Sequence, residues 1–502
     1  MWKIKNANWN LFSSTLETQE DFITLKRCKA RTRFLVKNSK ASSWKNFVSS
    51  IHNQTDSSIV WKKIKSIKGT NRSNVINLLI DSKLSTSPYD VANSLGRIFH
   101  ENSCNANYDQ DFLNYSQCYV DPVNSVDPLD SQQSLLNSPL KIEELEDALH
   151  NCKSKSPGPD GIPYSFIKNF PKNTLNHLLA IYNLIWNSNV FPESWKHGYV
   201  IPILKPNKNK FLAESYRPIC LLNTLCKLLE KIVNRRLIWF IENLNFLTPE
   251  QNGFRCNRST MNNLLTIKNE LHSSLNNKQN LGMISFDIVK AYDTAWRPRI
   301  LNKLNKIIAK GYMLDFISNF LNHRIFQVKT SNTLSDIFLQ ESGVPQGSTI
   351  SVTLFLIVIN DISEGISRPN IPLLFADDFT ILCRSTNVNS IQSILQDSTN
   401  KLTSWSKTSG FRFSPEKTNL TVFSHKRNKK KIHINIGNQV VENQPNVKIL
   451  GITFDHKASW IPHILNLKNT TAPRLNIIKT LGHTSWGAKS QTLLKIHKAF
   501  IL

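Results

Sequence analysis

The chain has 502 residues, of which 40% are hydrophobic, so it can hold two or three domains and is not a disordered polymer. Its 62 lysine and arginine residues against 36 aspartate and glutamate residues give a formal net charge of +26. Such an excess favours a polyanionic partner, with nucleic acid ahead of an anionic membrane.

Cysteine spacing and hydropathy narrow the cellular setting. The eight cysteines form no Cys-x-x-Cys pair, so neither a zinc knuckle nor a compact disulfide framework is predicted, and a reducing compartment is favoured. The start of the chain lacks the apolar region of a secretory signal. The most apolar run, Leu354–Ile359, is far shorter than the roughly 20 residues of a membrane span. We expect a soluble intracellular protein, in the cytoplasm and nucleus, with no membrane partner.

The first 138 residues precede the segments that carry chemistry. Residues 1–104 are predicted to form a helical, basic N-terminal extension. Its interleaved basic and aromatic residues could follow a phosphate backbone, or its helices could be ordinary solvated amphipathic ones, and the sequence leaves both open. Residues 105–138 are rich in Asn, Asp, Ser, Gln and Pro, which predicts a polar, acidic linker between domains.

Residues 139–281 are predicted to mix helices with short strands. The hexapeptide Ser-Pro-Gly-Pro-Asp-Gly at 156–161 cannot stay helical and predicts a stiff turn. Helices are expected over 174–187 and 224–242. The strand Val200–Leu204 delivers Lys205 to a basic loop, and Arg217 follows nearby. These two cations could clamp a triphosphate, although basic loop residues are more often simply solvated.

A strand over 282–289 carries a single acid, Asp287, near its end. An apolar strand with one carboxylate is costly to bury unless that carboxylate is paired or ligating. The later turn Gly343–Ser348 is bracketed by glycines, which would let a nucleotide approach the backbone, although such turns also connect plain secondary structure. The apolar run after Thr349 predicts a core helix capped by Ser348 or Thr349.

The stretch Ile371–Cys383 places Asp377 and Asp378 between two short apolar runs, which predicts a strand, a turn and a second strand. Two adjacent carboxylates on rigid strands repel each other unless they face solvent, a cation or a metal. The pair therefore suggests a hard divalent ion, whereas taken alone it would be an ordinary turn.

Several motifs occur in order from Ser156 to Asp455, about three fifths of the chain. They are Ser-Pro-Gly-Pro-Asp-Gly-Ile, Tyr-Arg-Pro-Ile, Gly-Phe-Arg-x-x-Arg-Ser-Thr, Phe-Asp-Ile-Val-Lys-Ala-Tyr-Asp, Gly-Val-Pro-Gln-Gly-Ser, Phe-Ala-Asp-Asp and Leu-Gly-Ile-Thr-Phe-Asp. The ordered set resembles the reverse transcriptases of non-LTR retrotransposons, of the LINE type and jockey-like. After Gly-Val-Pro-Gln-Gly-Ser that family commonly has proline where this chain has Val352.

The resemblance implies a metal site. Asp287, Asp377 and Asp378 would be the carboxylate ligands, and the carbonyl of Ile288 an additional one. Two Mg²⁺ ions are implied, with Mn²⁺ as a substitute, and hard oxygen ligands suit these ions. Asp378 could be a ligand or could shape the turn. Lys417 would be catalytic by protonating pyrophosphate, or it could be a plain surface lysine.

The resemblance also implies a nucleotide site. Arg217 and Lys205 would grip the incoming triphosphate, and Tyr292 would be the aromatic steric gate that collides with a ribose 2′-hydroxyl, or else a core tyrosine. The remaining residues of this site would line the nucleotide pocket or permit close approach: Gly343, Gln346 and Gly347.

The fold expected from the resemblance is an α+β right-hand polymerase. Residues 139–281 would form the fingers with entry helices, 282–455 the palm with its antiparallel sheet, and 456–502 a partial helical thumb, so that the chain would be a fragment of an element. The expected function is RNA-directed DNA polymerisation, with an RNA template, a DNA primer and deoxynucleotides as partners and the oligomeric state left open. Two other readings stand beside it, a truncated or domesticated nucleic-acid-binding protein without turnover and a two-metal nuclease.

Overall fold

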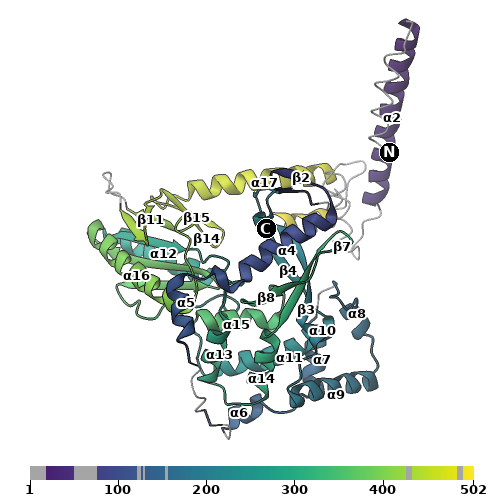
Figure 1. The fold of residues 1–502 in the computed structure, drawn as a ribbon. Coiled ribbons are helices and arrows are strands. Elements are labelled where there is room, and N and C mark those ends of the chain that lie inside the picture. Colours follow the sequence, from purple (N-terminus) through teal and green to yellow (C-terminus); the bar gives the residue numbers. More distant parts are fainter. Residues whose placement is uncertain are drawn as a thin grey trace. The chain divides into compact units, whose positions relative to one another are not determined.

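The computed structural model describes residues 19–49, 76–120, 126–127, 130–152, 156–424, 432–482 and 490–501 (Figure 1). The chain divides into two compact units, one formed by Ser73–Trp460 and the other by Met1–Arg72 together with Ile461–Leu502. The second unit contains the helices α2 (Gln19–Ser49), α17 (Ile461–Leu481) and α18 (Ser490–Phe500). No described helix is both long and apolar enough to cross a membrane.

A four-stranded antiparallel sheet lies at the centre of the unit Ser73–Trp460. Its strand order is β11 (Asn419–Phe423), β5 (Asn280–Phe286), β10 (Asp378–Ser385) and β9 (Asn370–Phe375). β5 is buried along almost its whole length. The strand predicted over 282–289 and the hairpin predicted over 371–383 are therefore confirmed.

Helices cover both faces of this sheet. Leu281 and Met283 of β5 pack with α12 (Thr260–Asn276), whereas Ile284 and Phe286 point into the main core. The helix α16 (Val388–Ser409) comes so close to β5 that a Cβ added at Gly282 would lie 2.2 Å from a methyl carbon of Ile391. The alternation of side chains along one strand thus fixes two helices on opposite faces.

A second sheet has the strand order β4 (Tyr216–Leu221), β3 (His197–Leu204), β6 (Arg324–Thr330) and β7 (Thr333–Leu334), with β8 (Phe338–Gln340) paired to β6. β3 and β6 run parallel, and the other pairs are antiparallel. The helix α4 (Pro88–Ser103) buries Leu95 and Phe99 in the core of this sheet. Residues 88–103 are therefore integrated into the compact unit instead of extending from it as the predicted N-terminal extension would.

The predicted polar linker over 105–138 also differs from the structure, which has η1 (Asn105–Asn107), α5 (Gln110–Gln117) and α6 (Ser131–Leu136) there. Tyr108 and Phe112 are buried, and the Phe112 ring meets the Trp296 ring edge to face at 5.2 Å. A few aromatic residues anchor this segment although its average composition is polar, because each buried aromatic ring removes a large apolar area from water.

The helical core supports the turn at 343–348. α15 (Thr349–Ile359) is almost entirely buried and is capped by the Ser348 side chain, as predicted. The buried carboxylate of Glu230, on α11 (Thr224–Asn243), accepts hydrogen bonds from Ser348 Oγ at 2.5 Å and from the Thr349 N–H at 3.0 Å. An anion at a helix N-terminus is favourable, so Glu230 fixes where α15 begins and the turn before it ends.

The unit Ser73–Trp460 also contains smaller helices and hairpins. The helices of the compact unit are completed by α7 (Ile142–His150), α8 (Tyr164–Ile167), α9 (Lys172–Ser188), α10 (Glu193–Lys196), η2 (Ala213–Ser215), α13 (Arg297–Asn305) and α14 (Tyr312–Leu321). Three further hairpins are β1 (Leu78–Ile80) with β2 (Lys83–Ser85), β12 (His433–Ile436) with β13 (Gln439–Glu442), and β14 (Asn446–Ile449) with β15 (Ile452–Asp455). The helices predicted over 174–187 and 224–242 are confirmed as α9 and α11.

Candidate active site

The hairpin of β9 and β10 turns through two residues, Ala376 and Asp377, because Phe375 pairs with Asp378 across it. Ala376 has a φ of +55°, a left-handed conformation that is unfavourable for residues other than glycine. The turn is therefore a strained one that the surrounding structure must hold.

Asp287 lies at the same end of the sheet. Phe286 pairs with Phe379, and continuing this antiparallel register by one residue places Asp287 opposite Asp378. Since β5 and β10 are neighbours, three carboxylates from two separate parts of the chain meet beside the turn. The structure thus brings together Asp287, Asp377 and Asp378, as the sequence predicted.

These carboxylates repel one another. Burial and the negative charge of Asp287 raise the pKa of Asp377, an effect that the Arg217 guanidinium opposes. Burial and the charges of Asp377 and Asp287 raise the pKa of Asp378 to about 6. Asp378 is exposed to solvent, which limits the effect of burial and lets water screen part of the repulsion. A divalent cation bound among the three would remove the repulsion.

Lys417 supplies one positive charge at this site. Its Nζ lies 3.0 Å from Oδ2 of Asp287, and their side chains are 63% and 39% exposed. A pair this exposed is worth about 0–1 kcal/mol, so the lysine can leave the carboxylate when another ligand arrives. Lys417 therefore lies beside the carboxylates, and its catalytic role stays a prediction.

The Ile288 carbonyl is oriented as a further ligand would need to be. Ile288 pairs with Phe413, and the flanking bonds run from Val289 N to Arg412 O and from Ser414 N to Asp287 O, each 2.9 Å. In this antiparallel pattern the residue between the two bonds points its own N–H and C=O to the opposite edge of the strand. For Ile288 that is the edge along which β10 runs.

Two more cations stand near the carboxylates. Ile203 of β3 pairs with Arg217 of β4, and Lys205 lies two residues after Ile203. The β3–β4 hairpin therefore brings Arg217 and Lys205 close together. Burial and the charges of Lys417 and Arg217 lower the pKa of Lys205, and the charge of Asp293 opposes this. Together with Lys417 these residues form a cationic group that could hold a polyphosphate.

Tyr292 is half-buried and stacks on Phe355 of α15, with ring centroids 4.4 Å apart and ring planes 20° from parallel. Burial and the charge of Asp377 raise the pKa of its hydroxyl. The ring is thus held rigidly beside the carboxylates, which suits a residue that limits the space at the site.

The turn 343–347 packs closely against the chain itself. A Cβ added at Gly343 would lie 2.5 Å from the carbonyl oxygens of Tyr292 and Asp293, and one added at Gly347 would lie 2.4 Å from that of Cys220. Both glycines also have positive φ, +74° and +122°. Close backbone packing therefore accounts for these glycines, and their contact with a nucleotide stays a prediction.

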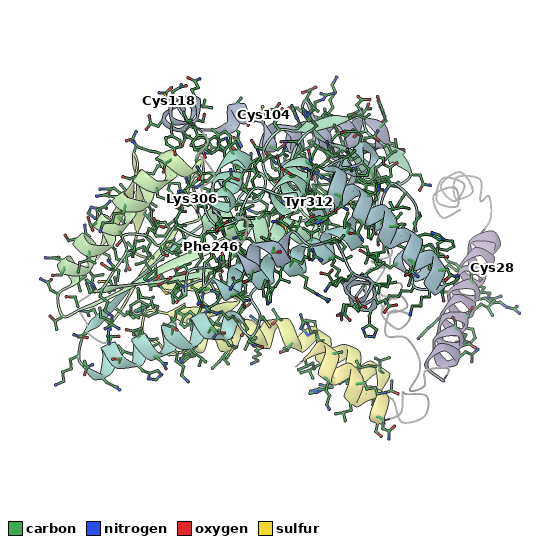
Figure 2. All side chains as sticks on the ribbon, turned by 90° about the horizontal axis from the view of Figure 1, so that it is seen from below. Cys28, Cys104, Cys118, Phe246, Lys306 and Tyr312 are labelled. Atoms are coloured by element: carbon green, nitrogen blue, oxygen red, sulfur yellow. The ribbon has the colours of Figure 1, made fainter. Side chains whose placement is uncertain are left out.

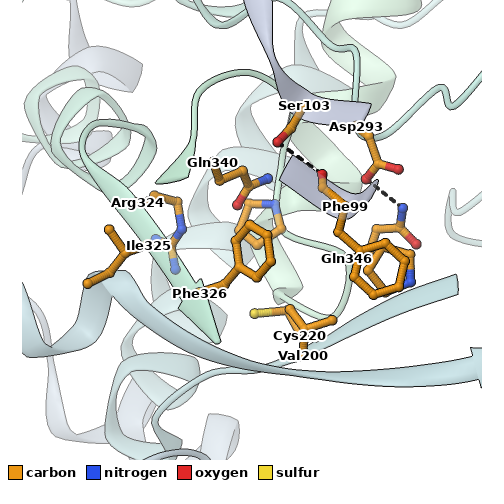
Figure 3. Close-up of a pocket in the computed structure, with 12 residues that line it drawn as sticks. Phe99, Ser103, Val200, Cys220, Asp293, Arg324, Ile325, Phe326, Gln340 and Gln346 are labelled. Atoms are coloured by element: carbon orange, nitrogen blue, oxygen red, sulfur yellow. Dashed lines mark hydrogen bonds between the residues drawn. The ribbon is translucent and has the colours of Figure 1, made fainter. Parts of the chain in front are cut away.

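Asp293 is a residue of the site that the sequence did not single out. Gln346 Nε2 donates to its Oδ1 at 2.8 Å (Figure 3). Burial raises the pKa of Asp293 to about 6, whereas the Gln346 hydrogen bond and the charges of Lys290 and Lys205 hold it down. Asp293 and Gln346 line a small cavity of about 30 Å³ together with Phe99, Arg324 and other residues (Figure 3). Asp293 thus fixes the orientation of the Gln346 side chain.

Gln251 is the second residue of the site that sequence reasoning did not single out. Its buried Oε1 accepts hydrogen bonds from the N–H groups of Ala376 at 2.9 Å and Gly253 at 2.8 Å. A Cβ added at Gly253 would lie 2.4 Å from the Ala376 nitrogen. The segment 251–253 therefore packs against the strained turn and accepts a hydrogen bond from it.

Residues 203–454 match the family described as reverse transcriptase (RNA-dependent DNA polymerase), which is just over half of the 502 residues. The chain belongs to the reverse transcriptase family. Its α+β architecture, with an antiparallel sheet carrying acidic residues at one end, agrees with this assignment.

Curated relatives come from mobile elements. The chain is 29% identical over 68% of its length to the probable RNA-directed DNA polymerase from transposon BS of Drosophila melanogaster, covering 38% of that protein. It is 27% identical over 67% of its length to the RNA-directed DNA polymerase from mobile element jockey of the same species, covering 37%. The chain thus spans about two fifths of the length of these relatives. A solved telomerase from Candida tropicalis aligns with 68% of this chain and 56% of its own at 14% identity, with a TM-score of 0.37.

Replacing Asp378 by asparagine is expected to stabilise the metal-free protein at neutral pH. A carboxyl whose pKa rises from 3.8 to about 6 on folding favours the folded state at pH below 3.8 and loses that contribution as the pH rises through 6. After allowance for screening, we expect Asp378→Asn to raise the free energy of unfolding by about 0.5–1 kcal/mol at pH 7.5 and by nothing at pH 4. Urea denaturation at both pH values measures this.

The matched control is Asp397→Asn, which removes a carboxylate that pairs with Lys401 at 3.1 Å on the surface. This change is expected to lower stability by a few tenths of a kcal/mol. An Asp378→Asn variant no more stable than the wild type at pH 7.5 would contradict the repulsion argument.

Proposed function

We propose that this chain is the RNA-directed DNA polymerase of a non-LTR retrotransposon, adding deoxynucleotides to a primer 3′-hydroxyl on an RNA template. The observation that carries the proposal is the convergence of Asp287, Asp377 and Asp378 at one end of β5 and β10. Membership in the reverse transcriptase family and the names of the curated relatives support it. The net charge of +26 suits an RNA template and a DNA primer.

The donor set fits Mg²⁺, with Mn²⁺ as a substitute. All candidate ligands are oxygens, from Asp287, Asp377, Asp378 and the Ile288 carbonyl, and Mg²⁺ keeps part of its shell for water and substrate phosphate. Two bound ions would supply Lewis acidity at the primer hydroxyl and at the departing pyrophosphate. Lys417 pairs with Asp287, and the charge of Arg217 opposes the rise in the pKa of Asp377.

The other residues have separate tasks in the transfer. Arg217 and Lys205 bind triphosphate oxygens and orient the α-phosphorus toward the primer. The bond from the primer oxygen to that phosphorus forms as the bond to pyrophosphate breaks, and the hydroxyl proton is lost to solvent. Lys417 donates a proton to the leaving pyrophosphate. Gln346, fixed by Asp293, lines the nucleotide pocket with Gly343 and Gly347 at its base.

We assign residues 139–281 to the fingers, 282–455 to the palm and 456–502 to part of the thumb. α4 and α5 join this assembly, because α4 packs on the sheet of β6 and α5 contributes Phe112 to the cluster around Trp296. The β3–β4 hairpin of the fingers then carries Lys205 and Arg217 toward the acidic end of β5 and β10, so that fingers and palm share one site.

Primer extension on a homopolymer RNA template tests the function. The wild-type chain should incorporate deoxynucleotides only when Mg²⁺ or Mn²⁺ is added. Asp377→Asn should reduce the rate by at least about a thousandfold, because metal ligation at the reacting phosphate is worth several kcal/mol. Asp397→Asn, on the surface of α16, should leave the rate unchanged. A wild-type chain that binds RNA but incorporates nothing would instead identify a nucleic-acid-binding protein without turnover.

Tyr292 should set the preference for deoxynucleotides over ribonucleotides. Tyr292→Val removes the ring and should lower the ratio of deoxynucleotide to ribonucleotide incorporation at least about tenfold, since one steric contact is worth about 1–3 kcal/mol. Tyr292→Phe keeps the ring stacked on Phe355 and should keep the ratio within about twofold. Competing both nucleotide types in the same extension reaction gives the ratio directly. An unchanged ratio in Tyr292→Val would show that the ring is only part of the core.

A further inference from the structure

His100, Cys104 and Glu341 form a cluster of metal-ligating side chains outside the carboxylate site. One donor atom from each lies within 4.8 Å of the other two, and all three side chains are half-buried. His100 lies in the last turn of α4 and Cys104 directly follows that helix, four residues later. Glu341 follows β8, so the cluster joins two segments that are more than 230 residues apart in the chain.

A backbone carbonyl holds one nitrogen of the His100 ring. Its Nδ1 lies 2.7 Å from the carbonyl oxygen of Leu339. A carbonyl can only accept, so Nδ1 carries the proton and Nε2 is left to bind a cation. A backbone carbonyl that holds one ring nitrogen in this way is the usual support of a metal-binding histidine.

The backbone orients the Glu341 carboxylate. Its Oε2 accepts the Asn105 N–H at 2.9 Å, from the residue directly after Cys104. The carboxylate and the thiol are thereby held at the same junction, with donor atoms within 4.8 Å of each other.

We propose that His100, Cys104 and Glu341 bind one Zn²⁺ ion and leave its fourth position for water or another ligand. A set with one nitrogen, one sulfur and one oxygen suits zinc and excludes magnesium, which takes oxygen ligands. Zinc bonds of about 2.0–2.3 Å would draw the donors to about 3.3–3.8 Å apart, a movement that side-chain rotation can supply. Thiolate, carboxylate and neutral imidazole together cancel the charge of the ion.

The ion would stabilise the junction between the end of α4 and the turn that carries Gln346. Ser342 N donates to Ser103 O at 2.8 Å, and Ser342 Oγ bonds Asn105 Oδ1 at 2.6 Å. These bonds already join the end of α4 to the residues just before Gly343. Zinc at the cluster would add metal–ligand bonds at the same junction.

Alkylation of single cysteines tests the proposal on the intact chain without any activity measurement. The purified protein is stripped with a chelator, then reacted with a maleimide with and without one equivalent of Zn²⁺, and each cysteine is followed by peptide mass spectrometry. Cys104 should react at least tenfold more slowly with zinc, because a ligated thiolate is blocked. Cys118, labelled with Cys104 in Figure 2, and Cys256 are exposed and should react equally fast in both conditions.

Two variants tie the effect to this cluster. His100→Gln and Glu341→Gln should each abolish the zinc protection of Cys104, whereas His323→Gln, outside the cluster, should keep it. A Cys104 that reacts at the same rate with and without zinc in the wild-type chain would overturn the proposal and leave the three side chains as a hydrogen-bonded network. Protection that survives both substitutions would also overturn it, since the zinc would then be held elsewhere.

Discussion

Repulsion among Asp287, Asp377 and Asp378 is the constraint that the rest of the site accommodates. Folding gathers three carboxylates at one end of two strands, and burial together with their mutual repulsion raises the pKa values of Asp377 and Asp378. Such an arrangement costs stability in the absence of a cation, so the rigid sheet around it has to be stable on other grounds. The buried β5 and the two helices on its faces supply that stability, and the charges of Lys417 and Arg217 reduce the cost.

The second cost is the conformation of the turn. Ala376 has positive φ, and a residue in that region is disfavoured by about 1–2 kcal/mol. Gln251 offsets this cost by accepting the Ala376 N–H from a buried position, and Gly253 leaves room for the turn to pack there. The segment 251–253, distant in sequence, thus holds the turn that positions Asp377. A similar arrangement operates at the other side of the site, where Asp293 holds Gln346 and Glu230 fixes the start of α15.

Local patterns predicted the parts whose structure depends on neighbouring residues. The hairpin at Asp377, the strand before Asp287 and the cap at Ser348 follow from apolar spacing and from residue types that the sequence displays directly. Gln251 and Asp293 could not be found in this way. The hydrogen-bond partner of Gln251 lies 125 positions away in the chain, and that of Asp293 lies 53 positions away. The same reason explains the segment 105–117, where Tyr108 and Phe112 find the distant Trp296 and form structure that average composition does not predict. The sequence Lys-Arg-Asn-Lys-Lys-Lys at 426–431 predicts a cationic loop, and these residues lie outside the described ones.

We propose that the three carboxylates hold two divalent ions when template, primer and nucleotide are present. Electron paramagnetic resonance of free Mn²⁺ counts the ions bound by a complex of the chain with an RNA template, a chain-terminated primer and the next matching deoxynucleotide. We expect two ions per complex in the wild type and a loss of ion binding in Asp287→Asn. Two ions retained at the same affinity in Asp287→Asn would contradict it, because the metals would then be held by other residues.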